Sequence, residues 1–177
     1  LENTTLNGQD SILFGSTMSQ VQTLKNQDYA TVYGLQVSLK YLLNDNLTFN
    51  SSYTILESAS SDDEPIRHIT PNFGGSSLEY NKGKWNVSIS STYNQEFRNA
   101  QFTSAEKNRS FIYAKDENNL PHSPGWFTLN ARANVKLKEN IGLNVALENI
   151  LDKRYRPYAS RITAPGRNIQ VALRASF

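Results

Sequence analysis

Apolar and polar residues alternate with a period of two through most of this 177-residue chain, which is the pattern of half-buried β-strands. In the segment 127–137 the odd positions are Phe, Leu, Ala, Ala, Val and Leu, and the even positions are Thr, Asn, Arg, Asn and Lys. The same alternation predicts strands at 33–41, 47–55, 85–93, 141–147 and 168–177, with weaker strands at about 72–80 and 11–20. No apolar run approaches the roughly 20 residues of a membrane-spanning helix. We therefore expect an all-β chain of about eight antiparallel strands.

The connections between these predicted strands alternate between short and long. The short ones lie at 43–46, 81–84 and 138–140, and the long ones at about 21–30, 57–71, 95–125 and 151–166. In an up-and-down antiparallel sheet this alternation places every tight turn at one end. Greek-key sandwiches have no reason to sort their loops in this way, whereas transmembrane β-barrels have short turns at one end and long loops at the other. The sequence thus predicts that residues 1–177 form a single β-barrel region.

The composition excludes several other classes of protein. Hydrophobic residues make up 38% of the chain, below the roughly 45–50% that is typical of globular domains. Asn, Ser, Thr and Gln take their place rather than runs of charge, so disorder is a poor fit. The net charge of +2 does not favour nucleic acid as a partner. With no cysteine, the chain has no disulfide scaffold, thiol nucleophile or cysteine-ligated zinc.

Aromatic residues on the apolar face of the predicted strands form two rows, as expected for the two interfaces of a bilayer. The row beside the tight turns consists of Tyr41, Phe49, Tyr80, Trp85 and Phe177. The row beside the long loops consists of Tyr33, Tyr53, Tyr93 and Phe127. The opposite face carries the charged residues Lys40, Glu79, Arg132, Lys136, Glu148 and Arg174. These charges are expected to line an aqueous or plugged lumen, because they point away from lipid.

The last 30 residues contain an ordered series of turn signals. An Asn-hydrophobic-hydrophobic-Asp-x-x-Tyr motif is formed by Asn149, Ile150, Leu151, Asp152 and Tyr155. Pro165, Gly166 and Arg167 follow, just before the alternating strand that ends on Phe177. Asn and Asp side chains can bond neighbouring backbone groups where a strand turns into a loop, and a Pro-Gly pair first restricts and then frees the chain.

In this order, these residues resemble the C-terminal end of the TonB-dependent outer-membrane receptors. The resemblance is specific over about 125–177 and looser, but collinear, back to about residue 29, where "YATVYGLQVSLKY" is similar to the Tyr-Gly-Glu strand start of the family. Gln36 stands where an acidic residue is commoner. The resemblance implies a barrel of about 22 strands, filled by an N-terminal plug domain with an energy-coupling segment before it. Neither the plug nor most of that wall fits in 177 residues, so the chain is expected to be the last eight strands.

The resemblance also implies the function, the location and the partners. It implies a receptor in the outer membrane of a Gram-negative bacterium for energy-coupled uptake of a scarce nutrient, first of all a ferric siderophore, then cobalamin or a glycan. The implied partners are outer-membrane lipid, the plug and the remaining barrel, the TonB protein, and the insertion machinery that reads the last strand. The candidate substrate contacts are the aromatic and arginine residues of the long loops: Arg98, Phe102, Phe111, Tyr113, Arg154, Tyr155, Arg156 and Tyr158.

We expect no catalysis, no cofactor and no metal site. His68 and His122 stand singly in long loops without companion carboxylates at ligand spacing. The acidic run Asp62, Asp63 and Glu64 could hold calcium, but such a run is more often a solvated loop tip. Two alternatives stay open. One is a complete eight-stranded barrel serving as an adhesin, anchor or lipid enzyme, although a lumen face of Ser, Thr, Asn and Gly suits a wider wall. The other is a soluble β-sandwich binding module.

Overall fold

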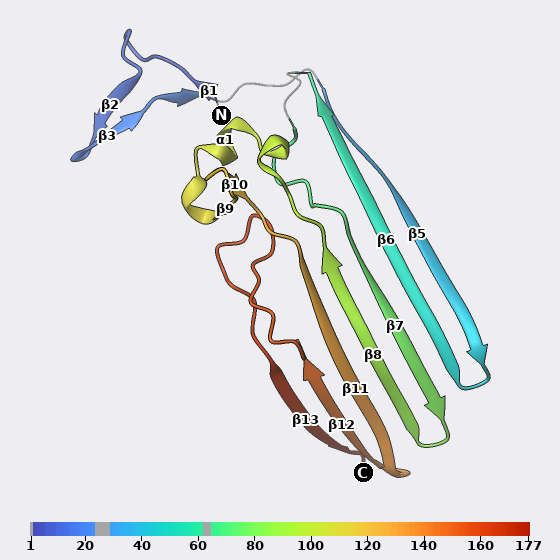
Figure 1. The fold of residues 1–177 in the computed structure, drawn as a ribbon. Coiled ribbons are helices and arrows are strands. Elements are labelled where there is room, and N and C mark those ends of the chain that lie inside the picture. Colours follow the sequence, from blue (N-terminus) through green and yellow to red (C-terminus); the bar gives the residue numbers. More distant parts are fainter. Residues whose placement is uncertain (1, 24–28, 62–64) are drawn as a thin grey trace.

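The computed structural model describes residues 2–23, 29–61 and 65–177. Seven antiparallel strands form one open sheet, each paired with its neighbours along the chain (Figure 1). These strands are β5 (Ala30–Asn44), β6 (Leu47–Ser60), β7 (Phe73–Lys82), β8 (Trp85–Asn94), β11 (Trp126–Lys138), β12 (Ile141–Glu148) and β13 (Asn168–Ala175). The predicted antiparallel, up-and-down fold class is confirmed, with seven strands in the sheet where about eight were expected.

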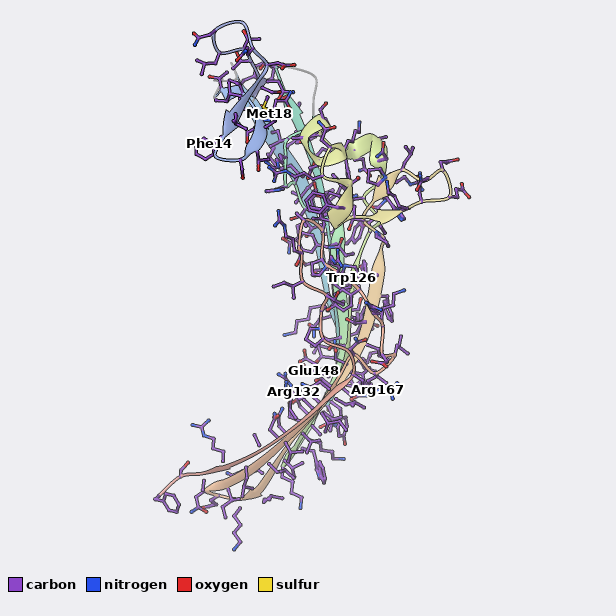
Figure 2. All side chains as sticks on the ribbon, turned by 90° about the vertical axis from the view of Figure 1, so that its left-hand side faces the viewer. Phe14, Met18, Trp126, Arg132, Glu148 and Arg167 are labelled. Atoms are coloured by element: carbon purple, nitrogen blue, oxygen red, sulfur yellow. The ribbon has the colours of Figure 1, made fainter. Side chains whose placement is uncertain are left out.

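The single strand expected at 11–20 is wrong. Instead, β2 (Ser11–Phe14) and β3 (Thr17–Gln20) form a separate hairpin, in which Leu13 pairs with Met18. Gly15 between them has a φ of +64°, a left-handed conformation that other residues rarely adopt, and it lets the chain reverse direction. The short strands β1 (Glu2–Asn3) and β4 (Gln22–Thr23) pair with each other. Figure 2 shows Phe14 and Met18 beyond the long-loop end of the sheet.

Tight turns join the strands at one end of the sheet, and the described parts of the long connections after β6, β8 and β12 lie at the other (Figure 1). In the β5–β6 turn, the backbone N–H of Asn46 donates to Asn44 Oδ1 at 2.9 Å. In the β7–β8 turn, Gly83 has a φ of +56°. The sorting of loops expected from the sequence is therefore confirmed for these six connections. Part of the expected connection at 21–30 lies outside the described residues.

The strand register places one alternating, mostly apolar set of residues from all seven strands on one face, whereas Phe73 and Trp126 lie on the other. One row across this face consists of Tyr41, Phe49, Leu78, Ile89, Ala131, Leu147 and Ile169. A matching row on the opposite face consists of Lys40, Asn50, Ser77, Ser90 and Asn130. The six charged residues expected on the polar face all lie on it, and Arg132 Nη2 is 3.9 Å from Glu148 Oε1 (Figure 2).

Among the described residues, no second layer of protein covers the apolar face. Leu35, Val37 and Leu39 keep 54–61% of their surface exposed. The total accessible surface is 12673 Å², whereas roughly 8,700 Å² is expected for a compact protein of this mass. A β-sandwich covers its apolar face with a second sheet, so the soluble-module alternative is not supported. An eight-stranded barrel needs a closed sheet, and this sheet is open. No helix in the described ranges is long and apolar enough to cross a membrane.

The connection between β8 and β11 folds into a small unit at the long-loop end. Its elements are the 3₁₀-helices η1 (Asn99–Gln101) and η2 (Ser110–Ile112), the short helix α1 (Ser104–Lys107), and the strands β9 (Ala114–Lys115) and β10 (Pro121–His122). The base of the unit is closed by two backbone hydrogen bonds of 2.9 Å between Phe97 and Ser123. The two ends of this long connection therefore lie side by side.

Candidate functional site

Four aromatic rings from two connections form the loop core, by which we mean Phe97, Phe102, Tyr113 and Tyr158. The ring centroids of Phe102 and Tyr113 are 4.4 Å apart, and those of Phe97 and Tyr158 are 4.6 Å apart. Phe102 is only 1% exposed. The structure thus brings together three predicted substrate contacts, Phe102, Tyr113 and Tyr158, but it packs them against one another.

Glu106, a carboxylate that is 2% exposed, lies within the loop core. It accepts hydrogen bonds from Thr103 N and Thr103 Oγ1 at 3.1 Å each, from the Tyr113 hydroxyl at 3.4 Å, and from the Tyr158 hydroxyl. The pKa of Tyr113 is raised to about 12, mainly by burial and secondly by the negative charge of Glu106. Burial and the hydrogen bond to Glu106 raise the pKa of Tyr158 as well. Both phenols therefore stay protonated and donate to the carboxylate.

Sequence reasoning missed Glu106, although the sequence contains a signal for it. Thr103 and Glu106 form a capping box around α1, in which Thr103 Oγ1 accepts from the backbone N–H of Glu106 and the Glu106 carboxylate accepts from that of Thr103. The Ser/Thr-x-x-Glu spacing predicts such a capping box. The two tyrosine donors give no such signal, because they come from elsewhere in the chain.

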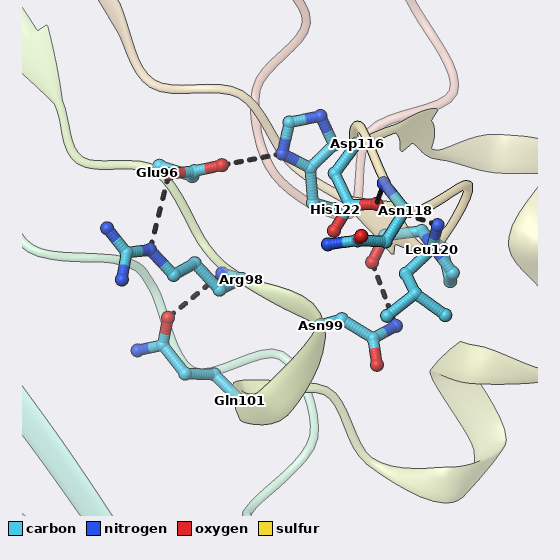
Figure 3. Close-up of polar contacts among 9 residues, drawn as sticks. Glu96, Arg98, Asn99, Gln101, Asp116, Asn118, Leu120 and His122 are labelled. Atoms are coloured by element: carbon cyan, nitrogen blue, oxygen red, sulfur yellow. Dashed lines mark hydrogen bonds and ion pairs between the residues drawn. The ribbon is translucent and has the colours of Figure 1, made fainter.

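Glu96 and His122 hold together the two ends of the 95–125 connection (Figure 3). His122 Nδ1 lies 2.6 Å from Glu96 Oε1, and Arg98 Nε lies 3.4 Å from Glu96 Oε2. The hydrogen bond to His122 lowers the pKa of the Glu96 carboxyl group. Asn99 Nδ2 donates to the carbonyl oxygen of Pro121 at 3.0 Å, which adds a second link (Figure 3). His122, which stands alone in the sequence, is thus paired with a carboxylate 26 residues away.

The 149–167 connection docks onto both the sheet and the loop core. The Tyr155 ring packs on Trp126 of β11, whose side chain lies on the polar face, with a centroid distance of 4.2 Å. Arg156 Nη1 donates to the Ile112 carbonyl oxygen at 2.9 Å. Of the eight predicted substrate contacts, four keep exposed side chains: Arg98, Phe111, Arg154 and Arg156.

A cavity of about 340 Å³ lies between the 95–125 and 149–167 connections. Three cationic residues line it, namely Lys153, Arg154 and Arg156, and they stand beside His122. Within the described ranges, no carboxylate is among its lining residues. The cavity therefore offers hydrogen-bond donors and positive charge.

The motif at the end of β12 connects the last connection to the sheet. Asn149, which is 5% exposed, donates from Nδ2 to the carbonyl oxygens of Lys153 at 2.9 Å and Pro165 at 3.1 Å. Asp152 Oδ1 accepts from the backbone N–H of Arg167 at 2.8 Å. A Cβ on Gly166 would stand 2.7 Å from Asp152 Oδ1, so a larger residue there would displace the carboxylate from this hydrogen bond. These bonds hold the strand exit and the strand entry together.

Five aromatic residues follow a diagonal line near the tight turns. Tyr41 and Phe49 pair directly and belong to the row across the apolar face that is described above. Counted from that row along their own strands, Tyr80 lies two residues closer to the tight turns, Trp85 lies four residues closer, and Phe177 lies eight residues closer. This drift amounts to about 27 Å along the strands for about 29 Å across them. If the line is taken as level, the strands tilt by about 43°, which agrees with the tilt of roughly 35–45° in membrane barrels.

The aromatic residues near the long loops follow a roughly parallel line, with one departure. Tyr33 lies eight residues from Tyr41 along β5, toward the long loops. Tyr93 and Phe127 pair with each other, and each lies four residues from the row of Tyr41 in the same direction. Tyr53 shares the row of Tyr93, and the two rings stack at 5.8 Å. Tyr53 therefore lies within the apolar band rather than at its boundary near the long loops.

The polar face carries a ladder of asparagine side chains near the tight turns. Asn144 Nδ2 donates to Asn134 Oδ1, Asn134 Nδ2 donates to Asn86 Oδ1 at 2.8 Å, and Asn86 Nδ2 donates to Asn81 Oδ1. The amides thus link β7, β8, β11 and β12 in sequence. Among the described residues, no group of three or more His, Asp and Glu could hold a metal ion. The acidic run Asp62, Asp63 and Glu64 lies outside the described residues.

Solved structures of metal and siderophore receptors share this fold. The copper transporter OprC has a TM-score of 0.66 at 21% identity, over 84% of this chain and 23% of that chain. The FrpB iron transporter from Neisseria meningitidis has a TM-score of 0.63 at 16% identity, over 86% and 24%. The ferric yersiniabactin uptake receptor FyuA from Yersinia pestis has 0.57 at 17% identity, over 90% and 25%. This chain spans about a quarter of their length, and no curated protein sequence matches it.

The sequence also matches a family profile. The profile described as "TonB dependent receptor-like, beta-barrel" covers residues 3–150, which is well over half of the chain. This family consists of transport receptors rather than enzymes. The resemblance seen in the sequence, the open antiparallel sheet and the structural likeness agree with this match. The chain therefore belongs to the TonB-dependent receptors and forms part of their β-barrel.

Proposed function

We propose that this chain supplies the C-terminal wall and loops of an outer-membrane receptor that takes up a ferric siderophore with energy from TonB. One observation carries this proposal: among the described residues, the apolar face of the two-faced sheet has no protein cover, and the long connections gather at one end. Hydrocarbon is the cover that such a face requires, since the paired strands satisfy one another's backbone groups and only the two outer edges stay open. The outer membrane of a Gram-negative bacterium is the corresponding location.

The aromatic lines support this orientation in the membrane. Tyr33 and Tyr41 on β5, and Tyr93 and Trp85 on β8, are each eight residues apart. At a tilt of about 43° this spacing gives a vertical separation of about 20 Å, close to the roughly 25 Å apolar band of outer-membrane barrels. Phe177 then lies at the interface on the tight-turn side, together with Trp85 and Tyr80.

The partners follow from the two open edges and the polar face. β5 and β13 each leave one edge without a partner strand in the described structure, and unpaired backbone groups are not tolerated in hydrocarbon. The remaining strands of the receptor barrel pair with these edges, and the plug faces the polar side. The insertion machinery reads β13. TonB acts through the N-terminal part of the receptor.

The choice of a ferric siderophore rests on charge at the loop end. The 149–167 connection contains five basic residues and one acidic residue, Asp152. A ferric siderophore surrounds its iron with anionic oxygens, which such a surface attracts. The solved ferric enterobactin receptor PfeA and the ferric yersiniabactin receptor FyuA share the fold. We assign substrate contact to Arg98, Phe111 and Arg154, and omit Phe102 because it is covered.

The test is uptake of iron by cells that lack the full-length receptor. Radiolabelled iron is supplied on a panel of siderophores to the deletion strain, to the complemented strain, and to a strain without TonB. We expect uptake of at least one ferric siderophore to be lost in the first and third strains and restored in the second. Uptake that continues without TonB would contradict energy coupling, and a loss of copper accumulation alone would contradict the substrate class.

A further inference from the structure

The cavity between the 95–125 and 149–167 connections has the size and the walls of a small ligand site. Its volume of about 340 Å³ is near the lower end of the roughly 300–1,000 Å³ of ligand pockets. Apolar atoms come from Ile112 and Pro124 of the 95–125 connection and from Pro157 of the 149–167 connection. Tyr155 also lines it and packs on Trp126 on the polar face of β11, so the cavity adjoins the upper end of that face.

The carboxylates of the two connections do not pair with Lys153 or Arg154. Asp152 accepts from the backbone N–H of Arg167, Glu106 is enclosed in the loop core, and Glu96 is engaged by His122 and Arg98. In the described part of the chain, Lys153 and Arg154 form no ion pair. Because both residues line the cavity, their charges are available to a ligand.

We infer that this cavity is a subsite for a small aromatic group that carries an anionic oxygen, with Lys153 and Arg154 as its charge partners; the inference rests on the proposed function above. Cationic nitrogen atoms beside apolar atoms match a flat ring with a carboxylate or phenolate at its edge. The group would bind at the base of the loops, beside the polar face. A bare metal cation finds repulsion there, so the metal arrives as a chelate.

The test compares two probes that differ in charge. Salicylate and salicylamide share a ring and a hydroxyl group, but only salicylate is an anion at pH 7. Each is titrated into the purified full-length receptor in detergent, and binding is measured by calorimetry. We expect salicylate to bind about tenfold more tightly at low salt, with the preference shrinking as salt is added. Arg154→Gln should reduce the affinity for salicylate about tenfold and leave that for salicylamide unchanged.

Arg161→Gln is the matched control. Arg161 belongs to the same connection but lies over the Phe111 ring, at 6.0 Å from its centroid, and does not line the cavity. We expect it to bind salicylate like the wild type. Arg154→Lys keeps the charge and should keep the preference, and Lys153→Gln provides a second removal of charge if Arg154→Gln does not fold. Heat-modifiable electrophoretic mobility reports the folding of each variant.

Three results would overturn the inference: equal binding of the two probes, no binding of salicylate up to about 10 mM, or equal losses in Arg154→Gln and Arg161→Gln. Failure of the proposed function has a different outcome. If no ferric siderophore is imported but salicylate still binds through Arg154, the cavity stands and the uptake function is wrong. If siderophore uptake is normal but salicylate shows no preference, only the subsite is wrong.

Discussion

Glu106 is the residue on which the folded loop end depends most. A buried carboxylate costs several kcal/mol unless hydrogen bonds replace its hydration. Here the backbone N–H and Oγ1 of Thr103 and the hydroxyls of Tyr113 and Tyr158 all reach it. Tyr113 belongs to the 95–125 connection and Tyr158 to the 149–167 connection. The carboxylate therefore fixes one connection onto the other, which sets the shape of the cavity between them.

Tyr113 makes this arrangement sensitive to alkaline pH. Its pKa is raised to about 12 from an ordinary value of 10, so the folded loop end favours the protonated phenol. The stabilisation is complete below about pH 10, and it is lost as the pH rises through about 12. The difference in tyrosinate absorbance between the wild-type receptor and Tyr113→Phe should show a midpoint near 12.

Glu106→Gln provides the comparison for this titration. It removes the negative charge and leaves the burial, so we expect the midpoint of Tyr113 to move down from about 12 but to stay above 10. A midpoint near 10 in the folded wild-type receptor would show that Tyr113 is not enclosed by the loop core. An unchanged midpoint in Glu106→Gln would remove Glu106 from the account.

At the scale of the elements, the strands are held in register by side chains as well as by backbone pairing. On the apolar face, Tyr53 and Tyr93 stack across Gly74, which pairs with both residues. A Cβ on Gly74 would meet the Tyr93 hydroxyl at 2.6 Å and the backbone oxygen of Ser52 at 2.4 Å, so the stack needs glycine. On the polar face, the asparagine ladder crosses four strands near the turns that connect them.

Removing the central amide of the ladder should lower the stability of the sheet. Asn134 accepts from Asn144 and donates to Asn86, so Asn134→Ala leaves two part-buried amides without that partner. We expect the free energy of unfolding to fall by about 1–3 kcal/mol, as measured by urea titration of the receptor in micelles. Asn81→Ala removes the exposed end of the ladder and one bond only. If Asn81→Ala lowers the free energy of unfolding as much as Asn134→Ala does, the central amide of the ladder contributes no more stability than its exposed end.

At the scale of the whole molecule, the unusual feature is an apolar surface that its own chain leaves open. The hydrophobic residues buried in the described structure are Phe97, Phe102 and Ala146, and two of these lie in the loops rather than in the sheet. If the inclined aromatic lines lie level in a bilayer, the strands tilt by about 43°, as in membrane barrels. The sheet then has the geometry of a barrel wall, and in the proposed receptor lipid covers its apolar face and neighbouring strands pair with both edges.

The two tryptophans of this chain test that orientation. Trp85 is 47% exposed on the apolar face, whereas Trp126 lies on the polar face against Tyr155. In receptor reconstituted with lipids brominated near the headgroups, we expect Trp85→Phe to remove a strongly quenched component of the fluorescence. Trp126→Phe should remove an unquenched one. Equal quenching of the two residues would contradict the assignment of lipid to one face and lumen to the other.

The strands were predictable because their signals are local. Alternation over residues 127–137 or 168–177 assigns each residue to one face of the sheet without reference to the rest of the chain. Tight turns such as Asn44–Asn46 are indicated by their own side chains, which bond the backbone of the turn. The hairpin at 11–20 was predictable in principle as well, since Gly15-Ser16 separates two short alternating runs. The weak apolar pattern on both sides of this pair, however, favours one continuous strand.

Local patterns in the sequence assign the strands, the apolar face of the sheet and the end at which the long connections lie, because a period of two and short turn signals act over a few residues. What those connections do is set by contacts between residues far apart in the chain. Glu106 meets Tyr158 across 52 residues, and His122 meets Glu96 across 26. Such contacts form only when adjacent strands bring the two connections to the same end of the sheet. There, burial of the aromatic rings and hydrogen bonding of the buried carboxylate favour one packing arrangement over the others.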